Sequence, residues 1–338
     1  MQLLEKLINL PGVSGNEEKV RDFIIKESGK YFNDVKVDNM GNVIVRKKGS
    51  KPSIMLMAHM DEIGLMVSSI SKKGWISVSP IGGIDPYILV GQKVHIEGKK
   101  GRIIGGVITT PNVLDSADLE KTLKMDDLFV YTGLTKQELN NLGIDIGSYM
   151  YFTESSKYCN LNLKDIIAGK ALDDRIGCYI LLELMKDLKI KNEVIFVFTV
   201  QEEIGLYGAK ASVFSLNPDY AIAIDVTPHN EFDQSITLRG GPVLTIKDAE
   251  MLANKCLVED IKRAAKKAKV LIQLEVSESG TTDATSVFAA RGGIPSAVFG
   301  VAVGNLHTTV GVASKKDIAE SIKVLKQLLK DPPKKCWS

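Results

Sequence analysis

The spacing of hydrophobic residues along the chain predicts an α/β fold. Residues 194–200 form an apolar run that is interrupted only by Thr199. A continuous run of this kind is typical of a strand covered on both faces, as in a parallel sheet. Shorter apolar runs predict further strands at residues 54–58, 220–224 and 296–301. Apolar residues at helical spacing predict helices that include residues 176–188 and 317–329.

Residues 65–163 have a different pattern. They contain many glycines and short alternating runs, such as residues 75–78 and 93–96, and few residues at helical spacing. Short strands separated by frequent turns indicate a small β-barrel or β-sandwich. We therefore interpret residues 65–163 as a β-rich domain inserted into a discontinuous α/β domain of residues 1–64 and 164–338.

The composition argues against several classes of protein. The formal net charge is +2, from 43 basic and 41 acidic residues, so charge gives no reason to expect binding to nucleic acid or to a membrane. The chain has no run of about 18 apolar residues and no signal-peptide pattern at its start. Its four cysteines are far apart and do not indicate a disulfide framework. We expect a soluble cytoplasmic protein.

The polar residues that follow the predicted strands are candidates for chemistry. Open α/β sheets place their active sites beyond the carboxyl ends of the strands. Two of the four histidines and seven acidic residues lie at such ends or at helix starts: His59, Asp61, Asp173, Asp174, Glu202, Glu203, Asp225, Asp283 and His307. Each residue alone has an ordinary explanation as a polar loop residue or a helix cap. Their coincidence at successive strand ends favours a shared site.

Carboxylates that converge in one cleft repel one another, so a cation must neutralise them. Imidazole and carboxylate groups are suitable ligands for zinc, cobalt or manganese. The set is larger than one ion needs and is sufficient for a pair of ions about 3.5–4 Å apart. Glu202 and Glu203 are adjacent, so we expect their side chains to point apart, with one binding metal and the other transferring protons. Their positions alone leave open which does which.

Seven short motifs occur in order along nearly the whole chain. They are Pro11-Gly12-Val13-Ser14-Gly15, residues 38–42, Ala58-His59-Met60-Asp61-Glu62-Ile63-Gly64, Leu172-Asp173-Asp174-Arg175-Ile176-Gly177, Gln201-Glu202-Glu203-Ile204-Gly205, Ala223-Ile224-Asp225-Val226 and residues 280–283. In these motifs the chain resembles the glutamyl or deblocking aminopeptidases. These are dinuclear metallopeptidases whose tetrahedral members are called TET peptidases, and some members are labelled endoglucanases.

The resemblance implies a set of metal ligands. His59 and Asp225 resemble the ligands of one ion, and Glu203 and His307 resemble those of a second ion. Asp173 resembles the carboxylate that bridges the two. The implied cofactors are two divalent ions per subunit, zinc or cobalt, with manganese as an alternative.

The resemblance also implies roles outside the metal ligands. Glu202 resembles the general base, and Asp61 resembles the residue that orients the metal-bound imidazole of His59. Asp174 follows Asp173 through a cis peptide in related enzymes. The implied fold is a zinc-exopeptidase-like catalytic domain with a mixed sheet, interrupted by a β-rich dimerisation domain. The implied assembly is a homo-oligomer in which dimers form a dodecamer.

The expected function is a metal-dependent aminopeptidase that acts on peptides with a free N-terminus. One alternative is a related dinuclear amidohydrolase, either an N-acyl amino acid deacylase or a carboxypeptidase, which the cleavage of N-blocked substrates distinguishes. A second is a polysaccharide hydrolase, whose two carboxylates need no metal. A third is an inactive binding protein with the same fold.

Overall fold

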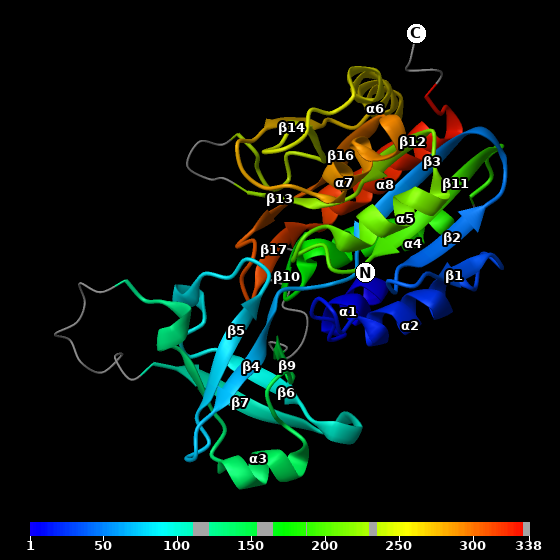
Figure 1. Cartoon of the computed structure of the whole chain (residues 1–338). Coiled ribbons are helices and arrows are strands. Elements are labelled where there is room, and N and C mark those ends of the chain that lie inside the picture. The colour runs from blue at the N-terminus through cyan, green and yellow to red at the C-terminus, as the bar shows by residue number, and fades with distance from the viewer. Residues whose placement is uncertain (111–121, 154–164, 187, 230–234, 334–338) are drawn as a thin grey trace.

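The structure is a computed structural model that describes residues 1–110, 122–153, 165–186, 188–229 and 235–333. Its α/β part is built on an 11-stranded mixed sheet (Figure 1). The main strands lie in the order β1 (Val35–Val37), β2 (Val43–Lys47), β11 (Asn192–Thr199), β3 (Ser50–His59), β12 (Tyr220–Ala223), β16 (Ser296–Gly304), β14 (Val243–Lys247) and β15 (Gln273–Val276). The remaining strands are β13 (Val226–Pro228) and β17 (Gly311–Ser314), which pair with β16, and β10 (Ile166–Gly169), which pairs with β17.

The four central strands of this sheet run in the same direction. β11 and β12 both pair in parallel with β3, and β12 pairs in parallel with β16. The strands outside them, β2 and β14, are antiparallel to their inner neighbours. The carboxyl ends of β3, β11, β12 and β16 therefore meet at one edge of the sheet.

Both faces of the central strands are buried, as the continuous apolar runs predict. Along β3, Leu56 packs into one core cluster, whereas Met55 and Met57 pack into a second cluster on the other face. The helices of the first cluster are α1 (Gln2–Asn9), α2 (Glu18–Ser28), α4 (Leu172–Met185), α6 (Lys255–Ala268) and α8 (Lys315–Lys330). The helices of the second are α5 (Tyr207–Leu216) and α7 (Asp283–Phe288).

The β-rich part is a closed six-stranded barrel that lies to one side of the large sheet (Figure 1). Its strands are, in order, β4 (Gly64–Ile70), β5 (Ile76–Ile81), β8 (Phe129–Tyr131), β7 (Ile103–Thr109), β6 (Lys93–Glu97) and β9 (Tyr149–Phe152). Helix α3 (Lys136–Leu142) packs against the barrel core through Leu139. Short 3₁₀ helices occur at Pro86–Ile88, Lys99–Gly101, Met125–Asp127 and Ala290–Gly292.

The predicted fold class is confirmed, and the structure shows a barrel where the sequence allowed a barrel or a sandwich. The division into an inserted domain and a discontinuous one stays a prediction, and its boundary at residues 163 and 164 lies outside the described residues. In the described part, no helix is long and apolar enough to span a membrane. Cys178 is a free, buried thiol on α4, whereas Cys256 is disulfide-bonded, a bond that the cysteine spacing did not predict.

Candidate active site

Seven of the nine residues collected from the sequence, those to which the resemblance gives a role, lie at the edge where the parallel strands end. His59 is the last residue of β3, and Asp61 follows it. Glu202 and Glu203 follow β11, Asp225 follows β12, His307 follows β16, and Asp173 lies in the first turn of α4. All except Asp61 line one cavity of about 410 Å³. The fold therefore collects these side chains in the position that an open α/β sheet reserves for chemistry.

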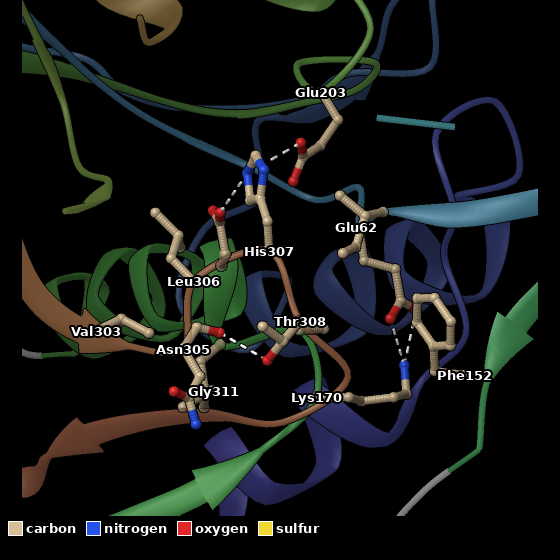
Figure 2. A pocket seen from close by; sticks show the side chains of 14 residues that line it. Glu62, Phe152, Lys170, Glu203, Val303, Asn305, Leu306, His307, Thr308 and Gly311 are labelled. Atoms are coloured by element: carbon tan, nitrogen blue, oxygen red, sulfur yellow. Dashed lines mark hydrogen bonds and ion pairs between the residues drawn. The ribbon is translucent and has the colours of Figure 1, made fainter. Parts of the chain in front are cut away.

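Asp173 lies between the two histidines. Its Oδ1 is 2.9 Å from Nε2 of His59, and its Oδ2 is 3.3 Å from Nε2 of His307. The same nitrogen of His307 is 3.4 Å from Oε2 of Glu203, and Figure 2 shows the imidazole pointing toward this carboxylate. The peptide bond between Asp173 and Asp174 is cis. One carboxylate thus faces an imidazole nitrogen with each of its oxygens.

The orientation of His59 leaves its Nε2 free to bind a cation. Its Nδ1 lies 3.2 Å from the backbone carbonyl oxygen of Asp61, which can only accept a hydrogen bond. Nδ1 therefore carries the proton, and Nε2 faces Asp173. In a neutral imidazole this places a nitrogen lone pair against a carboxylate oxygen, an arrangement that needs a proton or a metal ion between the two atoms.

Asp61 is fully buried behind the cavity and fixes the loop that carries the two glutamates. Its Oδ1 accepts the backbone N–H of Glu202 and its Oδ2 accepts that of Glu203, both at 3.1 Å. Its Oδ2 also accepts the hydroxyl of Ser14 at 2.6 Å. Burial raises the pKa of Asp61, but the hydrogen bond and charge of His59 outweigh burial, so the net pKa is lowered.

Two further side chains hold the residues just before this loop, and neither of them was among the site residues predicted from the sequence. Oδ1 of Asn42 accepts the backbone N–H of Val200 at 3.0 Å, and Oε1 of Glu17 accepts that of Gln201 at 3.2 Å. Gln201 has a positive φ of 54°. Together with Asp61, they bind four consecutive N–H groups, so the backbone that presents the glutamates is fixed by side chains from the first part of the chain.

Glu202, Glu203 and Asp225 are held in an environment that disfavours their negative charge. Burial, with the nearby Asp173, raises the pKa of Glu203 to about 8, and burial raises the pKa of Asp225 to about 7. Burial likewise raises the pKa of Glu202 well above its usual range. By contrast, the hydrogen bond from His307 and the contacts with His59 outweigh burial and lower the pKa of Asp173. Positive charge placed near Glu202, Glu203 and Asp225 would therefore favour their ionised forms.

The arrangement fits divalent metal ions. The structure has two candidate groups of ligand atoms, one from His59, Asp173 and Glu203 and the other from His59, Asp174 and Asp225. Within each group, the ligand atoms all lie within 4.8 Å of one another. Within the described residues, Oδ2 of Asp174 is buried without a hydrogen-bond partner. A buried carboxylate oxygen without a partner is costly unless a cation satisfies it. Asp174 was among the polar residues collected from the sequence, but the motifs gave it no ligand role.

A buried ion pair supports the loop between His59 and the barrel. Nζ of Lys170 lies 2.7 Å from both carboxylate oxygens of Glu62, as Figure 2 shows. The guanidinium of Arg175 is 3.7 Å from the same carboxylate and donates to the backbone carbonyl of Met60 at 2.7 Å. The barrel also reaches the site, because Gly83 lines the cavity and a Cβ at this position would lie 3.1 Å from Nδ1 of His307.

Comparisons with known proteins place the chain among metallopeptidases. Residues 41–324 match the model of the M42 glutamyl aminopeptidase family. A lysyl aminopeptidase of Pyrococcus furiosus is 34% identical over 98% of this chain and 96% of its own. The structure of an aminopeptidase from Desulfurococcus kamchatkensis superimposes with a TM-score of 0.93 at 31% identity, covering 98% of this chain and 94% of that one.

A TET1 peptidase of Pyrococcus horikoshii is also similar, with a TM-score of 0.88 and 33% identity over 97% of this chain and 98% of that one. The family match extends over well more than half of the sequence, and both structural matches cover almost the whole fold. The chain therefore belongs to the M42 glutamyl aminopeptidase family and is a hydrolase of peptide bonds.

Proposed function

We propose that this metal-dependent aminopeptidase binds a pair of divalent ions at Asp173 and removes single residues from free peptide N-termini. The observation that carries the proposal is the position of Asp173, whose two oxygens face Nε2 of His59 and Nε2 of His307. A carboxylate placed in this way has the arrangement of a ligand shared by two ions. The unpartnered oxygen of Asp174 supports the proposal, because it also favours a nearby cation.

The proposed ligands comprise a pair for each ion and one shared carboxylate: His59 with Asp225, Glu203 with His307, and Asp173. Asp174 is a further candidate for the first ion, because its carboxylate lies within reach of the same donors. Imidazole and carboxylate donors suit zinc or cobalt, with manganese as an alternative. Asp61 is not a ligand in this proposal. It fixes the imidazole of His59 and the backbone of the glutamates.

When bound, such ions polarise the carbonyl of the scissile peptide and lower the pKa of water. Glu202 is placed to move protons. Its carboxylate lines the cavity, with Oε2 4.0 Å from Nε2 of His59, and burial raises its pKa. We assign to it the transfer of a proton from the attacking water to the leaving amine. The acidic groups of the cavity attract a protonated free amine, which an N-acylated substrate lacks.

The substitution Glu202→Gln tests this assignment. Glutamine keeps the size of the side chain but cannot accept and return the proton. We expect kcat to fall by about 10²–10⁴-fold, while elemental analysis finds the same metal content as in the wild type. Retained turnover contradicts the role of Glu202. In parallel, Asp173→Ala is expected to lose metal from both positions, and an unchanged metal count contradicts the shared ligand.

We propose further that the barrel belongs to an inserted domain at residues 65–163, through which two copies associate into dimers of a larger particle. The separate hydrophobic core of the barrel supports an independent unit. The similar TET1 peptidase of Pyrococcus horikoshii can assemble into a tetrahedron or a large octahedral shell. Light scattering during size-exclusion chromatography tests the assembly, and a strictly monomeric chain contradicts it.

A further inference from the structure

The cavity has an acidic wall, formed by Asp248 and Glu275, that the proposed chemistry does not use. Glu275 lies on the last strand of the sheet path, β15, and Asp248 follows directly after the neighbouring strand β14. Among the described residues, no lysine or arginine lines the cavity. The negative charge of the acidic wall is therefore not balanced by a cation of the cavity lining.

The carboxylate of Glu275 is held in place by two hydroxyl groups from neighbouring strands. Oγ1 of Thr227 on β13 donates to Oε1, and Oγ1 of Thr245 on β14 donates to Oε2 at 2.6 Å. Thr245 is also the direct partner of Glu275 in the β14–β15 register. Each carboxylate oxygen receives one hydrogen bond and has a lone pair left to accept another. The carboxylate of Glu275, on β15, is thus held in place by side chains of β13 and β14 and can accept further hydrogen bonds.

The second acid, Asp248, is 5% exposed and is also incompletely satisfied. Its Oδ1 accepts the backbone N–H groups of Glu250 and Met251 at 2.8 and 2.6 Å. Its Oδ2 has no hydrogen-bond partner within the described part of the chain. The adjacent Lys247 does not compensate it, because its Nζ lies 2.9 Å from Glu278 and donates to the carbonyl of Ser277.

We infer that the acidic wall receives the side chain of the N-terminal substrate residue and selects a basic one, lysine or arginine. The inference rests on the proposed function, which binds the substrate amine and scissile carbonyl near Asp173. The first side chain branches from the carbon between these two groups and enters the same cavity. An ammonium or guanidinium group satisfies the acidic wall, an acidic side chain is repelled, and an apolar one leaves the buried Oδ2 of Asp248 without a partner.

The test measures kcat/KM for the p-nitroanilides of lysine, arginine, leucine and glutamate on the metal-loaded enzyme. These substrates carry only one side chain, so any preference reports on the N-terminal position. We expect lysine and arginine to exceed leucine by about tenfold or more, since a charge-assisted hydrogen bond is worth that factor. Glutamate is expected to be the poorest substrate of the four.

Variants then connect the preference to the acidic wall. Glu275→Gln is expected to lower the lysine-to-leucine ratio of kcat/KM by about tenfold, and Asp248→Asn to lower it in the same direction. Glu250→Gln serves as the matched control, because this acid is exposed and lies outside the cavity lining, and it leaves the ratio unchanged. Thermal denaturation establishes that each variant is folded.

The results distinguish a failure of the basic specificity from a failure of the proposed aminopeptidase activity. If none of the four substrates is cleaved, the proposed function itself fails. If leucine or glutamate is the preferred residue, the aminopeptidase proposal stands and the basic specificity is overturned. A wild-type ratio in folded Glu275→Gln also overturns it, as does a ratio that falls equally in Glu250→Gln.

Discussion

Oδ1 of Asp61 accepts the backbone N–H of Glu202 at 3.1 Å, so a fully buried carboxylate positions the residue to which we assign proton transfer. The other oxygen of Asp61 holds Glu203 in the same way. Because its backbone carbonyl faces Nδ1 of His59, one residue fixes both a proposed metal ligand and the proposed base. Small changes at Asp61 are therefore expected to reach the chemistry.

The substitution Asp61→Asn tests this coupling. The amide has only one acceptor oxygen, so it turns an N–H donor toward either Glu202 or Glu203 and leaves a buried donor unsatisfied. We expect kcat/KM and metal affinity each to fall by about 10–100-fold. Steady-state kinetics and metal titration measure the two effects. Asp126→Asn, at an exposed acid of the barrel, is the control, and equal behaviour of the two variants refutes the coupling.

Glu17 predicts a pH dependence of stability. Burial, with the charge of Asp61, raises its pKa from 4.5 to about 7. The folded state therefore binds more protons than the unfolded state between these values, and this residue lowers stability as the pH rises through them. Glu17→Gln keeps an acceptor for the N–H of Gln201 and removes the charge. We expect it to raise the free energy of unfolding by up to roughly 3 kcal/mol above about pH 7.

Denaturant unfolding at about pH 4.5 and about pH 8 measures this effect on metal-free protein. The stabilisation is expected to be present at the higher pH and nearly absent at the lower one. Glu18→Gln, at the exposed neighbouring position, is the control and changes little at either pH. If Glu17→Gln raises the free energy of unfolding equally at both pH values, the raised pKa of Glu17 is contradicted.

Metal removal is expected to destabilise the protein more as the pH rises. In the metal-free fold, the pKa values of Asp225 and Glu203 are raised to about 7 and about 8. Because both groups lose their protons less readily in the folded state than in the unfolded state, they lower the free energy of unfolding as the pH rises from about 4 through these values. Bound cations offset the charge, and only deprotonated ligands bind them well. Adding a chelator should therefore lower Tm more at about pH 9 than at about pH 6. An equal shift at both values, or no recovery on adding zinc, is the contrary result.

The buried ion pair of Lys170 and Glu62 predicts a large effect on stability. Both residues are almost completely buried, and the ammonium contacts both carboxylate oxygens. In Lys170→Met the carboxylate of Glu62 stays buried, and its remaining cation, Arg175, is 3.7 Å away. We therefore expect the free energy of unfolding to fall by about 3–5 kcal/mol. The double variant with Glu62→Gln should recover part of this loss, as measured by chemical denaturation.

A surface pair provides the matched control for that measurement. Lys19 contacts Glu97 at 2.9 Å, but its side chain is 45% exposed. Lys19→Met is therefore expected to change stability by no more than about 1 kcal/mol. If the two lysine variants lose similar stability, burial does not set the strength of the Lys170–Glu62 pair.

Local patterns predicted the parts of the site that depend on strand ends. The apolar run at residues 194–200 corresponds to β11 at Asn192–Thr199. Because β11 is parallel to β3, the end of β11 places Glu202 beside His59 at the end of β3. The contacts of Asn42 and Glu17 with Val200 and Gln201 join residues more than 150 positions apart. Periodicity is a local signal and carries no information on such pairs.

The acidic wall was hidden from the sequence for the same reason. Glu275 lies in a short strand whose residues alternate in exposure, and nothing nearby in the sequence marks it as part of a cavity. Its significance comes from the β14–β15 register, which places it beside Thr245, and from the hydrogen bond with Thr227. The disulfide at Cys256 was also beyond prediction, because cysteine spacing does not specify distance in the fold.

The proposed activity is the cleavage of peptides from a free N-terminus at a metal-dependent site that includes Asp173. The most direct test follows hydrolysis of free and N-acetylated aminoacyl p-nitroanilides by chelated enzyme, before and after cobalt or zinc is added back. We predict that activity is lost on chelation, returns with metal and is confined to the free-amine substrates. Cleavage of the blocked substrates, or activity that persists in the chelated enzyme, contradicts a metal-dependent aminopeptidase.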